Sequence, residues 1–129
     1  MILVSACLAG IRCRYDGDSA LDERVVELVK KGEALPLCPE QLGGLTTPRS
    51  PCQLKGDAEL VWIGKLRIFD QEGRDRTDAF LLGAREVLRV MNYYNIQEAI
   101  LKEKSPSCGR NGVTAYLLKK SGIKVTWLP

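Results

Sequence analysis

The sequence of 129 residues contains no histidine. Histidine is the side chain that proteins use most often as a general base and as a metal ligand. Acid–base chemistry in this chain therefore falls to carboxylate, lysine, tyrosine, cysteine or serine side chains. A metal held by the protein would be bound through sulfur or oxygen.

The sequence also lacks a long apolar run and a cluster of basic residues. No stretch approaches the roughly 20 apolar residues of a membrane helix, and the opening MILVSACLAG has no basic segment like that of a signal peptide. The 19 Lys and Arg and the 16 Asp and Glu are scattered, which argues against a nucleic-acid surface. We expect a cytoplasmic protein without membrane association, and the sequence predicts no oligomeric state.

Five cysteines are present, but no two of them form a Cys-x-x-Cys pair. An odd number of cysteines in a reducing compartment argues against disulfides. The missing pair disfavours a closed structural zinc site. Metal binding, catalysis and simple burial of small apolar thiols remain open.

Apolar patterns alternate between strands and helices along the chain. We expect strands near residues 1–6, 34–37, 97–102 and 123–127, and helices over residues 22–31, 77–93 and 112–122. This alternation predicts a single α/β domain over residues 1–129, with a mainly parallel, Rossmann-like sheet flanked by helices. The segments AELVWI and LRIF flank Gly64 and Lys65, which predicts a β-hairpin excursion near residues 59–69.

Cys7, Cys38 and Cys108 each stand at or just after the carboxyl end of a predicted strand. Loops from different parallel strands converge at that edge of a sheet, so the three thiols are expected together. They could hold zinc with a fourth ligand, or an iron–sulfur cluster. A centre with three protein ligands keeps one coordination position open. Cys13 could equally be a fourth ligand, a second thiol near the site or a buried apolar residue.

Polar side chains accompany these cysteines. Glu40 follows Cys38 by two residues and could reach a molecule at an open coordination position, although a solvated loop acid or a helix cap explains it too. Ser105 and Ser107 precede Cys108 in a loop where ordinary turn chemistry is the alternative. Arg14 and Asp16, in CRYDG, could grip a polar substrate or simply form a surface turn.

Five segments together resemble a known family. VSACLAGIRCRYDG, LCPEQLGGLTTPR, GRDRTDAFLLGA, ILKEKSPSCG and GVTAYLL are similar to the small bacterial domain family DUF523, in the family's order and over nearly the whole chain. The characterised branch of that family is of the thiouracil desulfidase type. Two features depart from the family pattern: only Arg110 and Asn111 separate SPSCG from GVTA, and Cys52 stands where no cysteine is expected.

The resemblance implies a [4Fe-4S] cluster held by Cys7, Cys38 and Cys108, with one iron atom free. It implies that Glu40 and Ser105 handle protons, and we expect substrate contacts from Arg14, Asp16 and Ser107. The implied reaction removes sulfur from a thiolated pyrimidine such as 2-thiouracil, without redox turnover, and the free iron accepts the sulfur.

Two other hypotheses remain. The chain could be a non-catalytic module that binds zinc, an iron–sulfur cluster or a small ligand, in which case Glu40 would have no measurable role. It could also act on thiolated tRNA, but the scattered charge argues against a large phosphate footprint.

Overall fold

Four parallel strands form the central sheet in the computed structural model, which describes residues 1–129. The sheet order is β2-β1-β5-β6, and every neighbouring pair is parallel. The strands are β1 (Ile2–Ser5), β2 (Ala34–Leu37), β5 (Glu98–Lys102) and β6 (Lys124–Leu128). This arrangement confirms the predicted α/β fold with its mainly parallel sheet.

Helical segments connect these strands. They are the 3₁₀ helix η1 (Ala6–Ala9) and the α-helices α1 (Glu23–Lys30), α2 (Pro39–Leu42), α3 (Ala58–Trp62), α4 (Thr77–Tyr93) and α5 (Val113–Lys120). The helices predicted over 22–31, 77–93 and 112–122 agree with α1, α4 and α5 to within about two residues. None of the helices combines the length and apolar character needed to cross a membrane.

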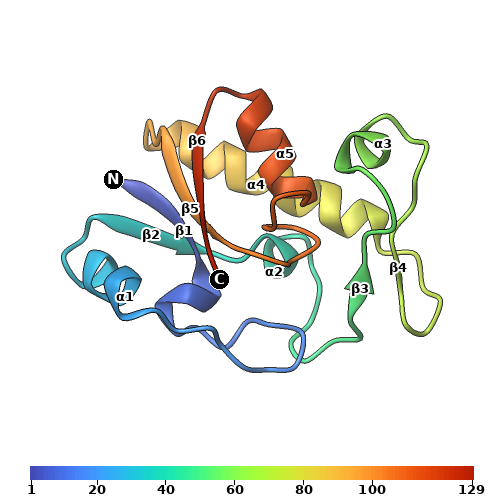
Figure 1. Ribbon diagram of the computed structural model, residues 1–129, viewed down its shortest axis with the longest axis horizontal. Helices are drawn as coiled ribbons and strands as arrows, with labels where there is room; N and C mark the ends of the chain where they lie inside the picture. The colour runs from blue at the N-terminus through green and yellow to red at the C-terminus, as the bar shows by residue number, and fades with distance from the viewer.

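The two faces of the sheet carry separate parts of the core. Leu3 of β1 packs with Ala99 and Leu101 of β5 and with buried residues of α4 and α5. Val4, the next residue of β1, packs in a second cluster with Val25 of α1. Neighbouring strand residues point to opposite faces, so α1 covers one side of the sheet, and α4 and α5 cover the other (Figure 1).

The β-hairpin predicted near residues 59–69 is wrong. Residues 58–62 form α3, in which Ala58 and Val61 are buried at helical spacing. Gly64 has φ of +80° and follows the helix end, where it serves as a helix-terminating glycine and not as a hairpin turn. The antiparallel pair of this region joins β3 (Cys52–Gln53) to β4 (Phe69–Asp70).

Helices α2 and α4 meet through two glycines. A Cβ on Gly83 of α4 would lie 1.9 Å from the carbonyl oxygen of Pro39, and one on Gly43 would lie 2.0 Å from that of Ala79. Only glycine permits this approach of the two backbones. Because α2 begins with Pro39 and Glu40, the glycine contact sets where Glu40 stands relative to the rest of the fold.

We predict that Gly83→Ala destabilises the protein by about 1–3 kcal/mol, because the added methyl group forces α2 away from α4. Denaturant unfolding followed by circular dichroism measures the change. Leu82→Ala is the control, since Leu82 lies on the same helix with 45% of its surface exposed. Equal stability of Gly83→Ala and the parent protein would contradict the close contact.

Candidate active site

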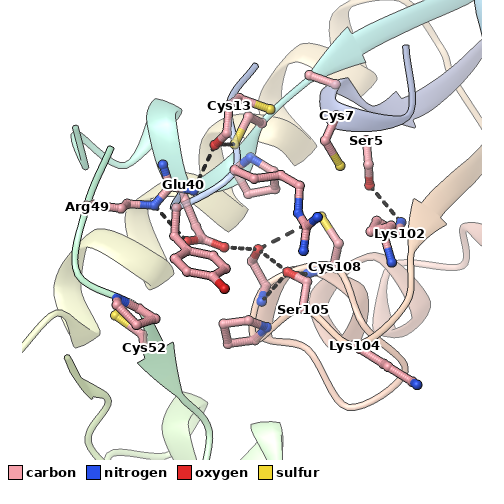
Figure 2. Close-up of a pocket in the computed structure, with 18 of the residues that line it drawn as sticks. Ser5, Cys7, Cys13, Glu40, Arg49, Cys52, Lys102, Lys104, Ser105 and Cys108 are labelled. Atoms are coloured by element: carbon pink, nitrogen blue, oxygen red, sulfur yellow. Dashed lines mark hydrogen bonds and ion pairs between the residues drawn. The ribbon is translucent and has the colours of Figure 1, made fainter. Parts of the chain in front are cut away.

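A cavity of about 210 Å³ opens at the carboxyl ends of β1, β2 and β5. Ser5 pairs with Leu37, so β1 and β2 end at the same level. The backbone N–H of Lys102, the last residue of β5, donates to the Ser5 hydroxyl at 2.9 Å, which ties the third strand end to the first. The segments that leave these strands, together with residues from 49 to 52, line the cavity (Figure 2).

All the cysteines of the chain line this cavity, and none forms a disulfide. Cys7 lies on η1, Cys38 directly follows β2, and Cys108 lies in the loop after β5. Three thiols from distant parts of the sequence are therefore brought to one place. Cys13 comes from the loop between η1 and α1, and Cys52 from β3.

Cys13 controls the charge of two neighbouring thiols. Hydrogen bonding from the Cys13 thiol lowers the pKa of Cys7, and it lowers the pKa of Cys38 to about 7, against the opposing effect of burial. The pKa of Cys13 itself is raised, because its proton is shared with Cys38 and Cys7. The lowered pKa values ease the deprotonation of Cys7 and Cys38 that metal ligation would require.

The other two thiols keep their protons in the metal-free protein. Burial raises the pKa of Cys108 to about 12. Burial, followed by the nearby carboxylates of Glu40 and Asp70, raises the pKa of Cys52 to about 11. A buried thiol such as Cys108 can still ligate, because a bound metal deprotonates a coordinating thiol.

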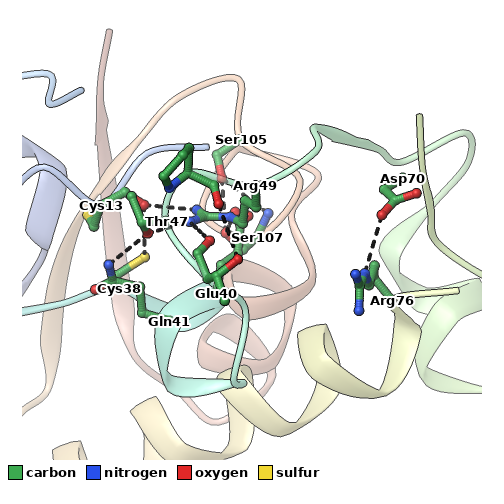
Figure 3. A network of polar contacts seen from close by, with 12 residues as sticks. Cys13, Cys38, Glu40, Gln41, Thr47, Arg49, Asp70, Arg76, Ser105 and Ser107 are labelled. Carbon is green, nitrogen blue, oxygen red and sulfur yellow. Dashed lines mark hydrogen bonds and ion pairs between the residues drawn. The ribbon is translucent and has the colours of Figure 1, made fainter. Parts of the chain in front are cut away.

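Glu40 takes part in a chain of hydrogen bonds across the cavity wall. Its Oε2 accepts from the Ser107 hydroxyl at 2.8 Å, and the hydroxyls of Ser107 and Ser105 lie 3.0 Å apart. A carboxylate is an acceptor only, so Ser107 donates to Glu40 and Ser105 donates to Ser107. Ser107 is 2% exposed, whereas Ser105 is partly exposed and marks the open end of the chain (Figure 3).

Arg49 and Lys102 line the cavity and were missed by the sequence analysis. The Arg49 Nε donates to Glu40 Oε1 at 3.1 Å, and both side chains are largely buried. Arg49 lies in the segment LTTPR, but nothing in the sequence pattern identifies its partner nine residues away. Lys102 has no carboxylate partner, and its charge contributes to the lowered pKa of Cys7.

The predicted substrate contacts are only partly brought together. Arg14 and Ser107 line the cavity, as does Ser105. Asp16 does not line it; its carboxylate accepts from the backbone N–H of Asp18 at 3.0 Å and shapes a surface turn. A short polar side chain beside a glycine forms such a turn readily, which is why the sequence did not separate the two roles.

Hydrogen bonds and an ion pair hold the short segment after Cys108 against other parts of the chain. The Asn111 side chain donates to the carbonyl of Gly56 at 2.8 Å and accepts from the backbone N–H of Ala58. Arg110 pairs with Glu103 at 2.6 Å and lies 4.8 Å from the centre of the Trp127 ring. Trp127 in turn donates from its indole N–H to the carbonyl of Cys108 at 2.8 Å.

The fold and the cavity define an α/β protein that presents cysteine thiols and a carboxylate–serine chain at the carboxyl edge of a parallel sheet, where such folds bind ligands. The profile of the 2-thiouracil desulfurase family matches residues 2–127. The chain belongs to the 2-thiouracil desulfurase family. This confirms the DUF523-type resemblance seen in the sequence and supports the expectation that the chain is an enzyme.

Two relatives are similar over nearly the full length. The uncharacterised protein YbbK of Bacillus subtilis (strain 168) is 41% identical over 141 positions, which cover 97% of this chain and 93% of YbbK. The solved structure of the [4Fe-4S]-dependent thiouracil desulfidase TudS (DUF523Vcz) is similar with a TM-score of 0.85 and 36% identity, over 98% of this chain and 89% of TudS. The YbbK alignment is longer than the 129 residues of this chain, so part of YbbK has no counterpart here.

The sulfur donors that line the cavity are of the type that ligates an iron–sulfur cluster. No group of three or more Cys, Asp, Glu or His side chains is arranged to hold one metal ion. Cysteines that hold a four-iron cluster bind separate iron atoms, so their thiols surround a volume and do not converge on a point. Thiols that line a cavity, two of them with a lowered pKa, fit that requirement.

We predict that iodoacetamide alkylates Cys38 before Cys52 in the reduced, metal-free protein at pH 7. Both side chains are partly exposed, but the pKa of Cys38 is about 7 and that of Cys52 about 11, so only Cys38 is substantially thiolate. The rate at Cys38 should fall as the pH drops below 7, because the thiolate is protonated. Peptide mass spectrometry over a pH series measures both rates, and earlier labelling of Cys52 would contradict the assignment.

Proposed function

We propose that the chain is a [4Fe-4S]-dependent desulfidase that removes sulfur from a thiolated pyrimidine such as 2-thiouracil. The observation that carries the proposal is that Cys7, Cys38 and Cys108 line the same cavity as the chain formed by Glu40, Ser107 and Ser105. Family membership and the similarity to TudS support it. The reaction exchanges the sulfur of a thiocarbonyl for the oxygen of water and releases hydrogen sulfide, so it needs no oxidant or reductant.

Cys7, Cys38 and Cys108 are the proposed ligands. They follow three different strands, and Cys7 and Cys38 have the lowered pKa that ligation favours. Cys13 is assigned to hydrogen bonding of Cys7 and Cys38, because its own pKa is raised by those contacts. When bound, the cluster supplies an iron atom free of protein thiolate, a soft Lewis acid that prefers the sulfur of a thiocarbonyl to the oxygen of a carbonyl.

The protein side chains manage the protons of this reaction. Glu40 acts as the general base that takes a proton from the attacking water. Ser107 connects Glu40 to Ser105. After Glu40 has taken the proton, both serine hydroxyls reverse their hydrogen bonds, so that Glu40 donates to Ser107, Ser107 donates to Ser105, and Ser105 at the open end gives a proton to the substrate ring. We propose that Ser107, which is buried and bonded to Glu40, acts in the proton path rather than in direct substrate binding.

The remaining lining residues suit a flat, polar ring. Tyr15 and three prolines, Pro39, Pro51 and Pro106, supply apolar surface, and Arg14 supplies a cation. An aromatic or proline wall packs against the face of a pyrimidine, while a guanidinium can donate to the oxygen at its edge. We propose these groups as the binding site for the base.

Anaerobic reconstitution should give about four iron and four sulfide per chain, with a brown colour. Cys7→Ser, Cys38→Ser and Cys108→Ser should each lose most of the cluster, because serine is a hard oxygen ligand. Cys52→Ser is the matched control and should keep the cluster, since Cys52 is assigned no ligand role. Iron and sulfide analysis with visible spectroscopy reads the result. Zinc alone, or a colourless protein, would favour the metal-binding module.

Glu40→Gln should lower the kcat of sulfide release from 2-thiouracil by about 10²–10⁴-fold while the cluster is retained, because the general base is removed. Glu103→Gln is the control, as Glu103 also lines the cavity but pairs with Arg110 outside the serine chain. Sulfide is measured by methylene blue formation and uracil by chromatography. Unchanged turnover in Glu40→Gln would contradict the role of Glu40 as general base and favour a non-catalytic binding module.

A further inference from the structure

The side chain of Arg49 contacts three separate parts of the site. Its Nε donates to Glu40 Oε1 at 3.1 Å, and its Nη2 donates to the carbonyl of Cys13 at 2.9 Å. Its Nη1 donates to Thr47 Oγ1 at 2.9 Å and to the carbonyl of Thr46 at 3.1 Å. The side chain is only 8% exposed, so these contacts are made away from bulk water (Figure 3).

Arg49 determines which way the Glu40 carboxylate faces. One carboxylate oxygen is held by Arg49, and the other accepts from Ser107 at 2.8 Å. Rotation of the carboxylate about its last bond would break both contacts at once. With the guanidinium absent, the Glu40 carboxylate would lack a counter-charge in a nearly buried position, and the Ser107 hydroxyl alone would not fix its orientation.

Arg49 also lies in the wall between two cavities. It lines the site cavity of about 210 Å³ and a second, polar cavity of about 370 Å³ that contains Ser50, Arg74 and Arg76. Truncation of Arg49 would therefore leave a space that is reached from the second cavity. A free guanidinium ion can enter such a space and replace the missing group.

We propose that Arg49 is a positioning residue of the desulfidase reaction. It orients Glu40 toward Ser107 and joins the Glu40 helix to the loop that carries Cys13. This inference rests on the proposed function, but nothing in the family resemblance assigns Arg49 a role. Arg49 does not touch the reacting atoms; it acts through Glu40.

Arg49→Ala, loaded with cluster, should release sulfide from 2-thiouracil with kcat reduced about 100-fold, since small displacements of a catalytic group cost this much. The KM should change little, and the iron content should equal that of the parent protein. Guanidinium chloride, below unfolding concentrations, should restore part of kcat, whereas sodium chloride at equal ionic strength should not. Arg12→Ala is the control, because Arg12 is exposed and carries the same charge in the neighbouring loop.

Arg49→Lys is the variant for the same kinetic test if Arg49→Ala does not fold. It keeps the charge, but one ammonium group cannot reproduce the planar fork that reaches Glu40 and the Cys13 carbonyl together. The same loss of kcat is expected from this variant. Parental kcat in either folded variant, or a loss that guanidinium and sodium chloride affect equally, would overturn the proposal.

A crystal structure of Arg49→Lys separates this inference from the proposed function. We expect the Glu40 carboxylate to leave hydrogen-bond distance of Ser107, whether or not the protein turns over thiouracil. If the parent protein, loaded with cluster, releases no sulfide, the proposed function fails, and this structure still tests the positioning. A Glu40 carboxylate that keeps its contact with Ser107 in the variant would overturn the role of Arg49.

Discussion

The parallel pairing of β1 with both β2 and β5 is the constraint on which the site depends. Cys7, Cys38 and Cys108 are separated by long stretches of sequence, and only this pairing places the ends of their strands side by side. Backbone hydrogen bonds hold the strands in this register and thereby place the segments that carry the thiols. The close glycine contact between α2 and α4 then fixes the position of Glu40 relative to the carboxyl ends of these strands.

Charge is balanced within the cavity by a few direct contacts. Hydrogen bonding by the Cys13 thiol lowers the pKa of Cys7 and Cys38, and the positive charges of Arg14 and Lys102 lower that of Cys7 further. The Glu40 carboxylate is matched by Arg49. Removing one member of a buried ion pair typically costs about 3–5 kcal/mol, because the other charge is left uncompensated. Arg49 is therefore needed to keep the Glu40 carboxylate in its nearly buried position.

The sequence predicted the parts of this structure that depend on local patterns. The buried strands and the helix from Thr77 to Tyr93 follow from apolar periodicity, and the convergence of three thiols follows from their places at strand ends. The hairpin prediction failed because Gly64 is compatible with a turn and with a helix end. The burial of Ala58 and Val61 at helical spacing, with Val61 packed against residues of α4 and α5, separates the two.

Contacts between distant residues could not be obtained from one sequence. The Glu40–Arg49 pair and the choice between Ser105 and Ser107 as the neighbour of Glu40 depend on distances that arise only after folding. The sequence left three roles open for Cys13, because its contacts with Cys7 and Cys38 form only when the chain folds. Asp16 shows the opposite case, in which a turn residue near the site points elsewhere.

The hydrogen bond between Cys13 and Cys38 affects which oxidation product these thiols form in oxygen. A thiolate beside a protonated thiol is the starting arrangement for disulfide formation, and a disulfide is reversible where sulfinic and sulfonic acids are not. Without a bound metal, the chain should lose a pair of titratable thiols in oxygen and regain them with a dithiol reductant. The hydrogen bond that lowers the pKa of Cys38 would then also divert oxidation toward a product that the cell can repair.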